Sequence, residues 1–183
     1  MKKAQRIIAA IVMALILTQS SALTLQAQRT LNVPMLRQLD TNWCWAASAL
    51  MTGRFLHPFP TRTQQQIVAH IHGDVVNEPA NVFQTTTATR FATHNTMGFQ
   101  GLTRSVSFAQ VRNHINVSLP VQALVHRSGA IGHFYVINGF NEPASGAHIF
   151  VIDPWDARGH YVSFNNFLNG NWRDTRPWVN TIL

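Results

Sequence analysis

The chain is almost devoid of cysteine, since Cys44 is the only one among 183 residues. A single cysteine excludes an internal disulfide, and it excludes a metal site built from several thiolates. Cys44 is therefore a buried small hydrophobe, one half of an intermolecular bridge, or a reactive thiol. The surrounding sequence has to decide among these three.

Lysine is nearly absent as well, because Lys2 and Lys3 are the only two, and acidic residues are few, with seven Asp and Glu in the whole chain. The other cations are arginines that are scattered along the sequence rather than clustered. The formal net charge of +7 therefore does not indicate a nucleic-acid partner. The chain also lacks internal repeats, low-complexity segments and an internal linker.

Long apolar runs are missing except for one near the start. Residues 1–6 carry three basic side chains, those of Lys2, Lys3 and Arg6. Residues 7–17 form an apolar run of eleven, which is too short to span a bilayer but typical of a signal-peptide core. Small and polar residues follow, and they predict cleavage after Ala22 or Ala27, with an uncleaved membrane anchor as the alternative. We therefore expect an exported protein, periplasmic or secreted, with no membrane contact after cleavage.

Removal of residues 1–27 leaves 156 of the 183 residues and lowers the formal net charge from +7 to +4. This length suits one domain with a sizeable core rather than two. We expect residues 28–183 to form that single domain.

The first half of the chain predicts helices. Residues 30–40 are expected to be extended, and the polar residues at 40–42 are favourable N-caps for an alanine-rich helix over residues 43–56. That helix has few polar positions, so we expect it to be buried on most sides. Cys44 would then lie in its first turn, where unpaired N–H groups and the helix dipole favour a thiolate. The prolines in residues 57–60 end it.

Further helices are predicted within residues 61–72, closed by Gly73, and over residues 81–94, where consecutive threonines weaken the helical pattern. A short amphipathic helix over residues 108–115 is expected to be capped by Ser107.

The second half of the chain predicts strands, because short runs rich in valine, isoleucine and aromatic residues alternate with glycine and proline turns. The expected strands are residues 120–126, 133–140, 147–153, 159–164 and 177–183, with a short helix at residues 164–168. Helices first and strands second, without alternation, indicate an α+β fold with an antiparallel meander.

One of the nine histidines has a distinctive setting. His133 opens a predicted strand directly after the sequence GAIG, whose glycines allow other groups to approach closely. The next predicted strand ends in Asp153. Because a hairpin joins the two strands, the start of the first and the end of the second lie at the same end of the sheet. An acid there can accept a hydrogen bond from the imidazole and fix its tautomer.

Gln38 supplies a fourth group, six residues before Cys44. Acyl transfer needs hydrogen-bond donors for the developing oxyanion, and a glutamine amide near a helix N-terminus can provide one. Gln38, Cys44, His133 and Asp153 can therefore serve as oxyanion donor, nucleophile, base and orienting acid.

The spacing Q-x5-C-W before an alanine-rich helix, followed by GHFYVINGF and VIDPW, resembles papain-like cysteine peptidases. The sequence is particularly similar to bacteriocin-leader-processing peptidases and to the cysteine-protease effectors that plant-pathogenic bacteria inject into hosts. The resemblance covers Val33 to about Leu168.

This resemblance implies a papain-like fold with the nucleophile at a helix N-terminus, packed on a C-terminal antiparallel sheet. It also implies that Gln38 forms the oxyanion hole for Cys44, that His133 is the base, and that Asp153, with Trp155 two places on, orients it. The expected substrate is a peptide or protein, and no cofactor is expected.

The sequence departs from the papain pattern in two respects. It has no disulfide of the papain kind, and too few residues lie between either predicted cleavage point and Val33 to form an inhibitory propeptide. Restraint of the enzyme would then come from narrow specificity, from delivery to another cell, or from a cognate inhibitor protein.

Two other functions use the same residues or the same fold. The thiol could deamidate or transamidate glutamine or cleave cell-wall peptides, and the domain could be a catalytically silent binding module. A metal at His70 and His72 is not expected, because these positions point apart on a helix and no acid or cysteine cluster accompanies them. His148 and His160 are expected at exposed strand positions.

Overall fold

The computed structural model describes residues 27–57, 62–127, 132–173 and 175–183. The predicted signal peptide therefore lies outside the described residues, apart from Ala27. In the described part of the chain, no helix combines the length and the apolar character needed to cross a membrane.

The helices lie where the sequence predicts them. Helix α2 spans Cys44–Leu56, α3 spans Gln64–His72, α4 spans Val82–Ala92 and α5 spans Phe108–Asn116. Thr63, Asn81 and Ser107 each form a reciprocal capping box with the glutamine three residues later, at the starts of α3, α4 and α5. Gly73 ends α3 in the left-handed conformation.

The threonines of α4 explain why this β-branched stretch is helical. The hydroxyls of Thr85, Thr86 and Thr89 each donate to the carbonyl four residues earlier, at 2.7 to 2.8 Å. The hydroxyls are thus satisfied within the helix, although such residues have low helical propensity.

The cap of α2 differs from the prediction. Trp43 occupies the N-cap position, and no side chain caps the helix. The Asn42 side chain instead donates to the Asn77 carbonyl at 2.8 Å, and the Asn42 N–H donates to the Asn77 side chain at 2.9 Å. The polar residues before the helix therefore fasten it to the segment around residue 77 rather than to its own N–H groups.

The second half of the chain forms the antiparallel sheet. Strands β3 (Val121–Arg127), β4 (Gly132–Asn141), β5 (His148–Asp153) and β6 (Arg158–Ser163) make the predicted meander. Helix α6 (Phe164–Asn169) follows β6.

The last strand, β7 (Thr175–Ile182), returns to pair with β3, so the strand order is β2-β7-β3-β4-β5-β6. Strands β1 (Gln28–Thr30), on β4, and β2 (Gly101–Leu102), on β7, were not predicted, because two or three residues are too few to show an alternating pattern.

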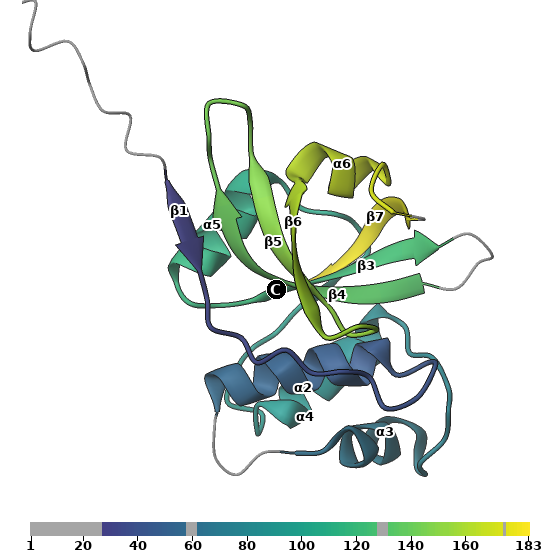
Figure 1. Cartoon of the computed structure of the whole chain (residues 1–183). Helices are drawn as coiled ribbons and strands as arrows, with labels where there is room; N and C mark the ends of the chain where they lie inside the picture. Colours follow the sequence, from purple (N-terminus) through teal and green to yellow (C-terminus); the bar gives the residue numbers. More distant parts are fainter. Residues whose placement is uncertain (1–26, 58–61, 128–131, 174) are drawn as a thin grey trace, which may run out of the picture.

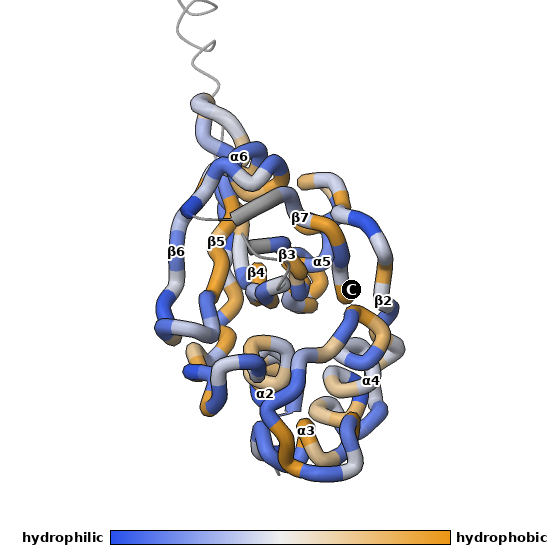
Figure 2. The backbone as a smooth tube through the Cα atoms, turned by 90° about the vertical axis from the view of Figure 1, so that its right-hand side faces the viewer, coloured by the Kyte–Doolittle hydropathy of each residue, from blue (hydrophilic) through white to orange (hydrophobic). Residues whose placement is uncertain are grey.

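Helices α2, α3 and α4 form a layer against one side of the sheet. Helices α5 and α6 lie on the opposite side of the sheet from this layer (Figure 1). The edge strand β6 is largely hydrophilic, and β5 beside it is largely hydrophobic (Figure 2).

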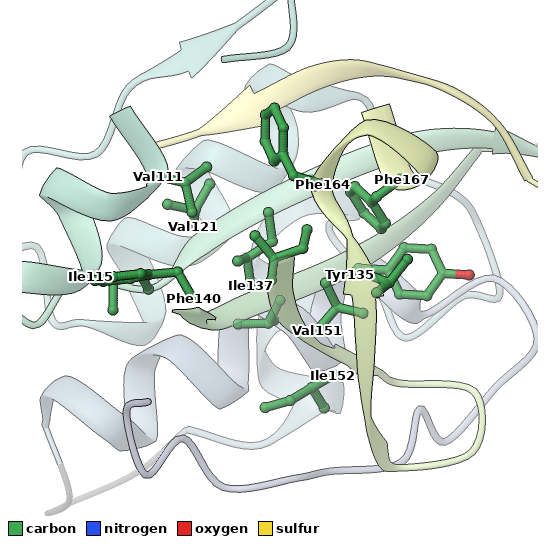
Figure 3. Packing of buried hydrophobic residues seen from close by; sticks show 14 of the residues in the cluster. Val111, Ile115, Val121, Tyr135, Ile137, Phe140, Val151, Ile152, Phe164 and Phe167 are labelled. Atoms are coloured by element: carbon green, nitrogen blue, oxygen red, sulfur yellow. The ribbon is translucent and has the colours of Figure 1, made fainter. Parts of the chain in front are cut away.

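Two apolar clusters hold these layers together. One lies under α5 and α6, where Val111, Ile115, Phe164 and Phe167 pack on β4 residues such as Ile137 (Figure 3). The other joins α2, α3 and α4 to the sheet and includes Cys44 and both flanking tryptophans. The start of α2 is thus part of a packed core, which holds the thiol in a fixed place.

Candidate active site

Cys44 is the first residue of α2 and is 6% exposed. Its backbone N–H has no acceptor within the helix, as for every residue in a first helical turn. The indole N–H groups of Trp43 and Trp45 donate to the carbonyls of Val76 and Glu78, at 2.9 and 3.1 Å. These two contacts fix the helix start against the segment after α3, so the tryptophans serve as packing groups around the thiol.

His133 and Asp153 meet as the hairpin geometry predicts. His133 is the second residue of β4 and Asp153 is the last residue of β5, and these strands are antiparallel neighbours. The His133 Nε2 atom lies 2.7 Å from Asp153 Oδ1, and both side chains are buried. The Cys44 thiol is the other neighbour of the ring: it lines the same hollow as His133 and contributes to raising the His133 pKa. Because Nε2 faces Asp153, the Nδ1 side of the ring is left for the thiol.

The pKa of His133 reflects these neighbours. Burial, the largest single influence, lowers the pKa, but hydrogen bonds with Asp153 and Cys44 and the negative charges of both groups raise it. The raising influences prevail, and the pKa of His133 lies above its ordinary value of 6.5. The surroundings therefore favour an imidazolium between two acidic partners, as a thiolate–imidazolium pair requires.

The described residues include two further partners of the Asp153 carboxylate. Its Oδ1 atom also accepts the backbone N–H of Trp155 at 2.9 Å, and its Oδ2 atom accepts from Arg173 Nη1 at 3.0 Å. Sequence analysis missed Arg173, because it follows α6 in a turn with a positive φ of 53° and no pattern marks it.

Gln38 is 7% exposed and lies close to the loop that leads into α2. Its Nε2 atom donates to the carbonyls of Asp40 and Thr41, at 2.7 and 2.8 Å, so both amide hydrogens are engaged with the backbone. In this arrangement the amide shapes the loop before Cys44. Its role as an oxyanion donor stays a prediction, and that role requires one of these two bonds to be released.

A glycine beside the histidine makes the close approach that the sequence suggested. A β-carbon at Gly132 would lie 2.6 Å from Leu124 Cδ1 on the neighbouring strand. The rest of the GAIG motif lies outside the described residues.

The thiol and imidazole open into a cleft. A hollow of about 150 Å³ is lined by residues of five segments, Cys44 and His133 among them. A second hollow, of about 390 Å³, is lined by residues 37–41 and Trp155. The two hollows share Thr41 and Trp155, so they adjoin, and Trp155 is an exposed aromatic wall common to both.

Two other histidines on the sheet, His148 and His160, have aromatic neighbours. His148 stacks on Tyr161 with ring centroids 4.6 Å apart, and His160 packs on Trp172 at 5.7 Å. Both are half-buried rather than exposed, so that prediction was wrong. Aromatic residues on the same face of the sheet cover them, which strand periodicity alone does not reveal.

Comparisons with known proteins identify the family and the fold. The Peptidase_C39 like family matches residues 30–178. Among solved structures, digestive procathepsin L 3 of the Tenebrio molitor larval midgut superposes with a TM-score of 0.52 at 10% sequence identity, covering 80% of this chain and 68% of that chain.

At that identity the superposition shows the fold alone, which is papain-like, with most helices in the first half of the chain and an antiparallel seven-stranded sheet built mainly from the second half. No curated protein sequence matches the chain. The family match over most of the sequence, together with the fold, shows that the chain belongs to the Peptidase_C39-like family within the papain-like cysteine peptidase superfamily.

Proposed function

We propose that this protein is an exported cysteine peptidase that hydrolyses peptide bonds with Cys44 as nucleophile. The observation that carries the proposal is that Cys44 and His133 line one hollow, where Cys44 helps to raise the pKa of His133, and that His133 is hydrogen-bonded to Asp153. A nucleophile, a base and an orienting acid in sequential contact are the minimum that acyl transfer by a thiol requires.

The reaction follows from the positions of these groups. The Cys44 thiolate attacks the carbonyl carbon of the substrate, and a tetrahedral intermediate forms. When the C–N bond breaks, His133 gives its proton to the departing amine, which leaves a thioester on Cys44. Water then attacks the thioester while His133 accepts its proton, and the carboxylic acid leaves as the C–S bond breaks. Asp153 keeps the ring oriented in both halves.

The oxyanion of the intermediate needs donors. We propose the Cys44 backbone N–H and the Gln38 amide, which is the pair that the papain-like resemblance implies. The backbone N–H is supported by its place at the start of α2. For Gln38, substrate binding would have to replace one of its two hydrogen bonds to backbone carbonyls.

We also propose that the substrate is an extended polypeptide segment. Two adjoining hollows beside the thiol, with Trp155 between them, suit a chain that continues on both sides of the reacting bond. A protein inhibitor that occupies the same cleft is the partner we propose for restraint.

Export is proposed from the basic and apolar start of the sequence, and processing after Ala22 fits the described strand better than processing after Ala27. The Ala27 carbonyl accepts the Glu142 N–H at 2.9 Å, just before β1 pairs with β4. Cleavage after Ala27 would remove this hydrogen bond, whereas cleavage after Ala22 would retain it.

Mass spectrometry of peptides incubated with the protein tests the reaction type. Hydrolysis of the backbone produces new termini, and these should be absent with Cys44→Ala. Conversion of a glutamine amide to a carboxylate without chain cleavage would instead assign a deamidase and refute peptidase activity. No modification of any peptide by a protein whose Cys44 still reacts with iodoacetamide would favour the binding module.

A further inference from the structure

The carboxylate of Asp153 is held from two sides. Its Oδ1 atom faces His133, and its Oδ2 atom accepts from Arg173 Nη1 at 3.0 Å. The Asp153 side chain is 1% exposed, whereas the Arg173 side chain is 39% exposed. A buried carboxylate with a positive charge at its outer oxygen is far less costly than one without it. Arg173 is thus the solvent-side partner of the acid that orients His133.

The position of Arg173 is itself determined by several groups. Its guanidinium lies 4.9 Å from the Trp172 ring, its Nη2 atom is 3.1 Å from His160 Nε2, and Nη2 is 3.7 Å from Asp156 Oδ2. Ligand atoms of Asp153, Asp156 and His160 lie within 4.8 Å of one another, and Arg173 contacts all three side chains. The guanidinium therefore already provides the positive charge toward which these groups converge.

We propose that Arg173 is a positioning residue for the reaction, and that it fixes the rotation of the Asp153 carboxylate so that Oδ1 stays on His133. With Oδ2 bound to Arg173, Oδ1 remains directed at the imidazole and at the Trp155 N–H. The effect of Arg173 on Cys44 is transmitted through Asp153 and His133. This inference rests on the proposed function of the triad.

The fork of the guanidinium suits this task. Nη1 reaches Asp153, the last residue of β5. Nη2 reaches Asp156, in the turn after β5, and His160, on β6. A lysine ammonium is a point charge, and it lacks the planar fork that meets both sides at once. Arg173→Lys should therefore retain only part of the effect.

The test is the rate at which iodoacetamide alkylates Cys44, followed by mass spectrometry between pH 5 and 9. This rate reports the thiolate and does not require a substrate, so it remains informative if peptidase activity is never found. The variants are Arg173→Gln, Arg173→Lys, Asp153→Asn and the double variant Arg173→Gln with Asp153→Asn.

Arg158→Gln is the matched control. Arg158 is the β6 residue in register with Asp153, and it is exposed. Within the described residues, its side chain makes no hydrogen bond or ion pair, so the control removes the same charge near the same acid without removing a contact.

We expect Arg173→Gln to slow alkylation near neutral pH by roughly ten-fold, because it leaves the buried Asp153 carboxylate without its partly exposed cationic partner. Arg158→Gln should change the rate less than about two-fold, and Arg173→Lys should lie between the two. In the Asp153→Asn background, Arg173→Gln should add less than about a further two-fold, because the acid through which it acts is gone.

A full additional loss in the Asp153→Asn background would show that Arg173 acts on the fold rather than on Asp153, and would overturn the proposal. The proposal would also be overturned if Cys44 were alkylated at the wild-type rate in Arg173→Gln, or if Arg158→Gln slowed alkylation as much as Arg173→Gln does. Near-ultraviolet circular dichroism of each variant identifies any that fails to fold, and the Arg173→Lys variant then carries the comparison.

Discussion

His133 Nε2 lies 2.7 Å from Asp153 Oδ1, and the two side chains come from the start of one strand and the end of the next. The residues are 4% and 1% exposed, so water does not compete for this hydrogen bond. The pair sets both the orientation and the charge of the imidazole beside Cys44, and the pH dependence of the protein should follow from it.

Replacement of Asp153 by asparagine should move the alkaline limb of kcat/KM to lower pH. The folded-state pKa of His133 is raised above 6.5, so the imidazolium, the acid of the proposed reaction, persists above pH 6.5 and is lost as pH rises through the raised value. The neutral asparagine amide cannot supply the negative charge that raises it. We also expect kcat/KM at neutral pH to fall by roughly 10²- to 10⁴-fold.

A pH profile of kcat/KM for wild type and Asp153→Asn measures this shift. An alkaline limb that stays in place, or moves upward, would mean that Asp153 does not control the charge of His133.

Gln38→Glu should separate the two roles open to Gln38. If its amide stabilises the oxyanion, kcat falls by about 10²- to 10³-fold while iodoacetamide still alkylates Cys44 at the wild-type rate. If it only shapes the loop through its bonds to Asp40 and Thr41, alkylation and KM change along with kcat.

Gln65→Glu, at an exposed position of α3, is the control for the added charge. We expect the first pattern for Gln38→Glu. Unchanged kcat in that variant would remove Gln38 from the proposed oxyanion hole.

The packing of α2 on α4 depends on Gly53. A β-carbon there would meet the Ala92 backbone at 2.7 to 2.9 Å, and backbone cannot move aside as a flexible side chain can. Gly53→Ala should therefore lower the free energy of unfolding by about 1 to 3 kcal/mol, despite the better helical propensity of alanine.

Urea unfolding of Gly53→Ala measures that loss. The matched control is Gly98→Ala, where a β-carbon would meet no atom within 4 Å. Equal stability of the two variants would show that α2 and α4 do not pack as closely as described.

In the proposed export, the processed protein should begin at Leu23. Cleavage after Ala22 retains the Ala27 carbonyl that accepts the Glu142 N–H, together with the whole of β1. Intact mass and N-terminal sequencing of the protein from the export compartment test this. A chain that starts at Gln28 would show that the other site is used.

The sequence predicted most of the fold because its signals are local. Ser107, followed by glutamine three places later, marks the start of α5 as predicted, and the valine-rich runs between glycine turns mark the meander. Strands β1 and β2 were not predicted, because these short segments are strands only through their pairing with β4 and β7.

The same distinction applies to the site. His133 and Asp153 could be joined from one hairpin, which is a short-range feature, whereas the link from Cys44 to this distant pair came from the resemblance to papain-like peptidases. Arg173 could not be joined to them, since its partners Asp153, Asp156 and His160 precede it by 13 to 20 residues across a helix and a turn, and only the folded chain brings them together. The engagement of the Gln38 amide by two backbone carbonyls was equally invisible, because it depends on the path of the loop.

The central claim, that Cys44 is the nucleophile of a peptidase, is tested most directly by profiling new N-termini across a proteome treated with wild type or with Cys44→Ala. We predict a set of termini that share a local sequence pattern, that arise with the wild type and that are missing with Cys44→Ala at equal protein concentration and equal thermal stability. The same termini in both samples, or none in either while Cys44 still reacts with iodoacetamide, would contradict the claim.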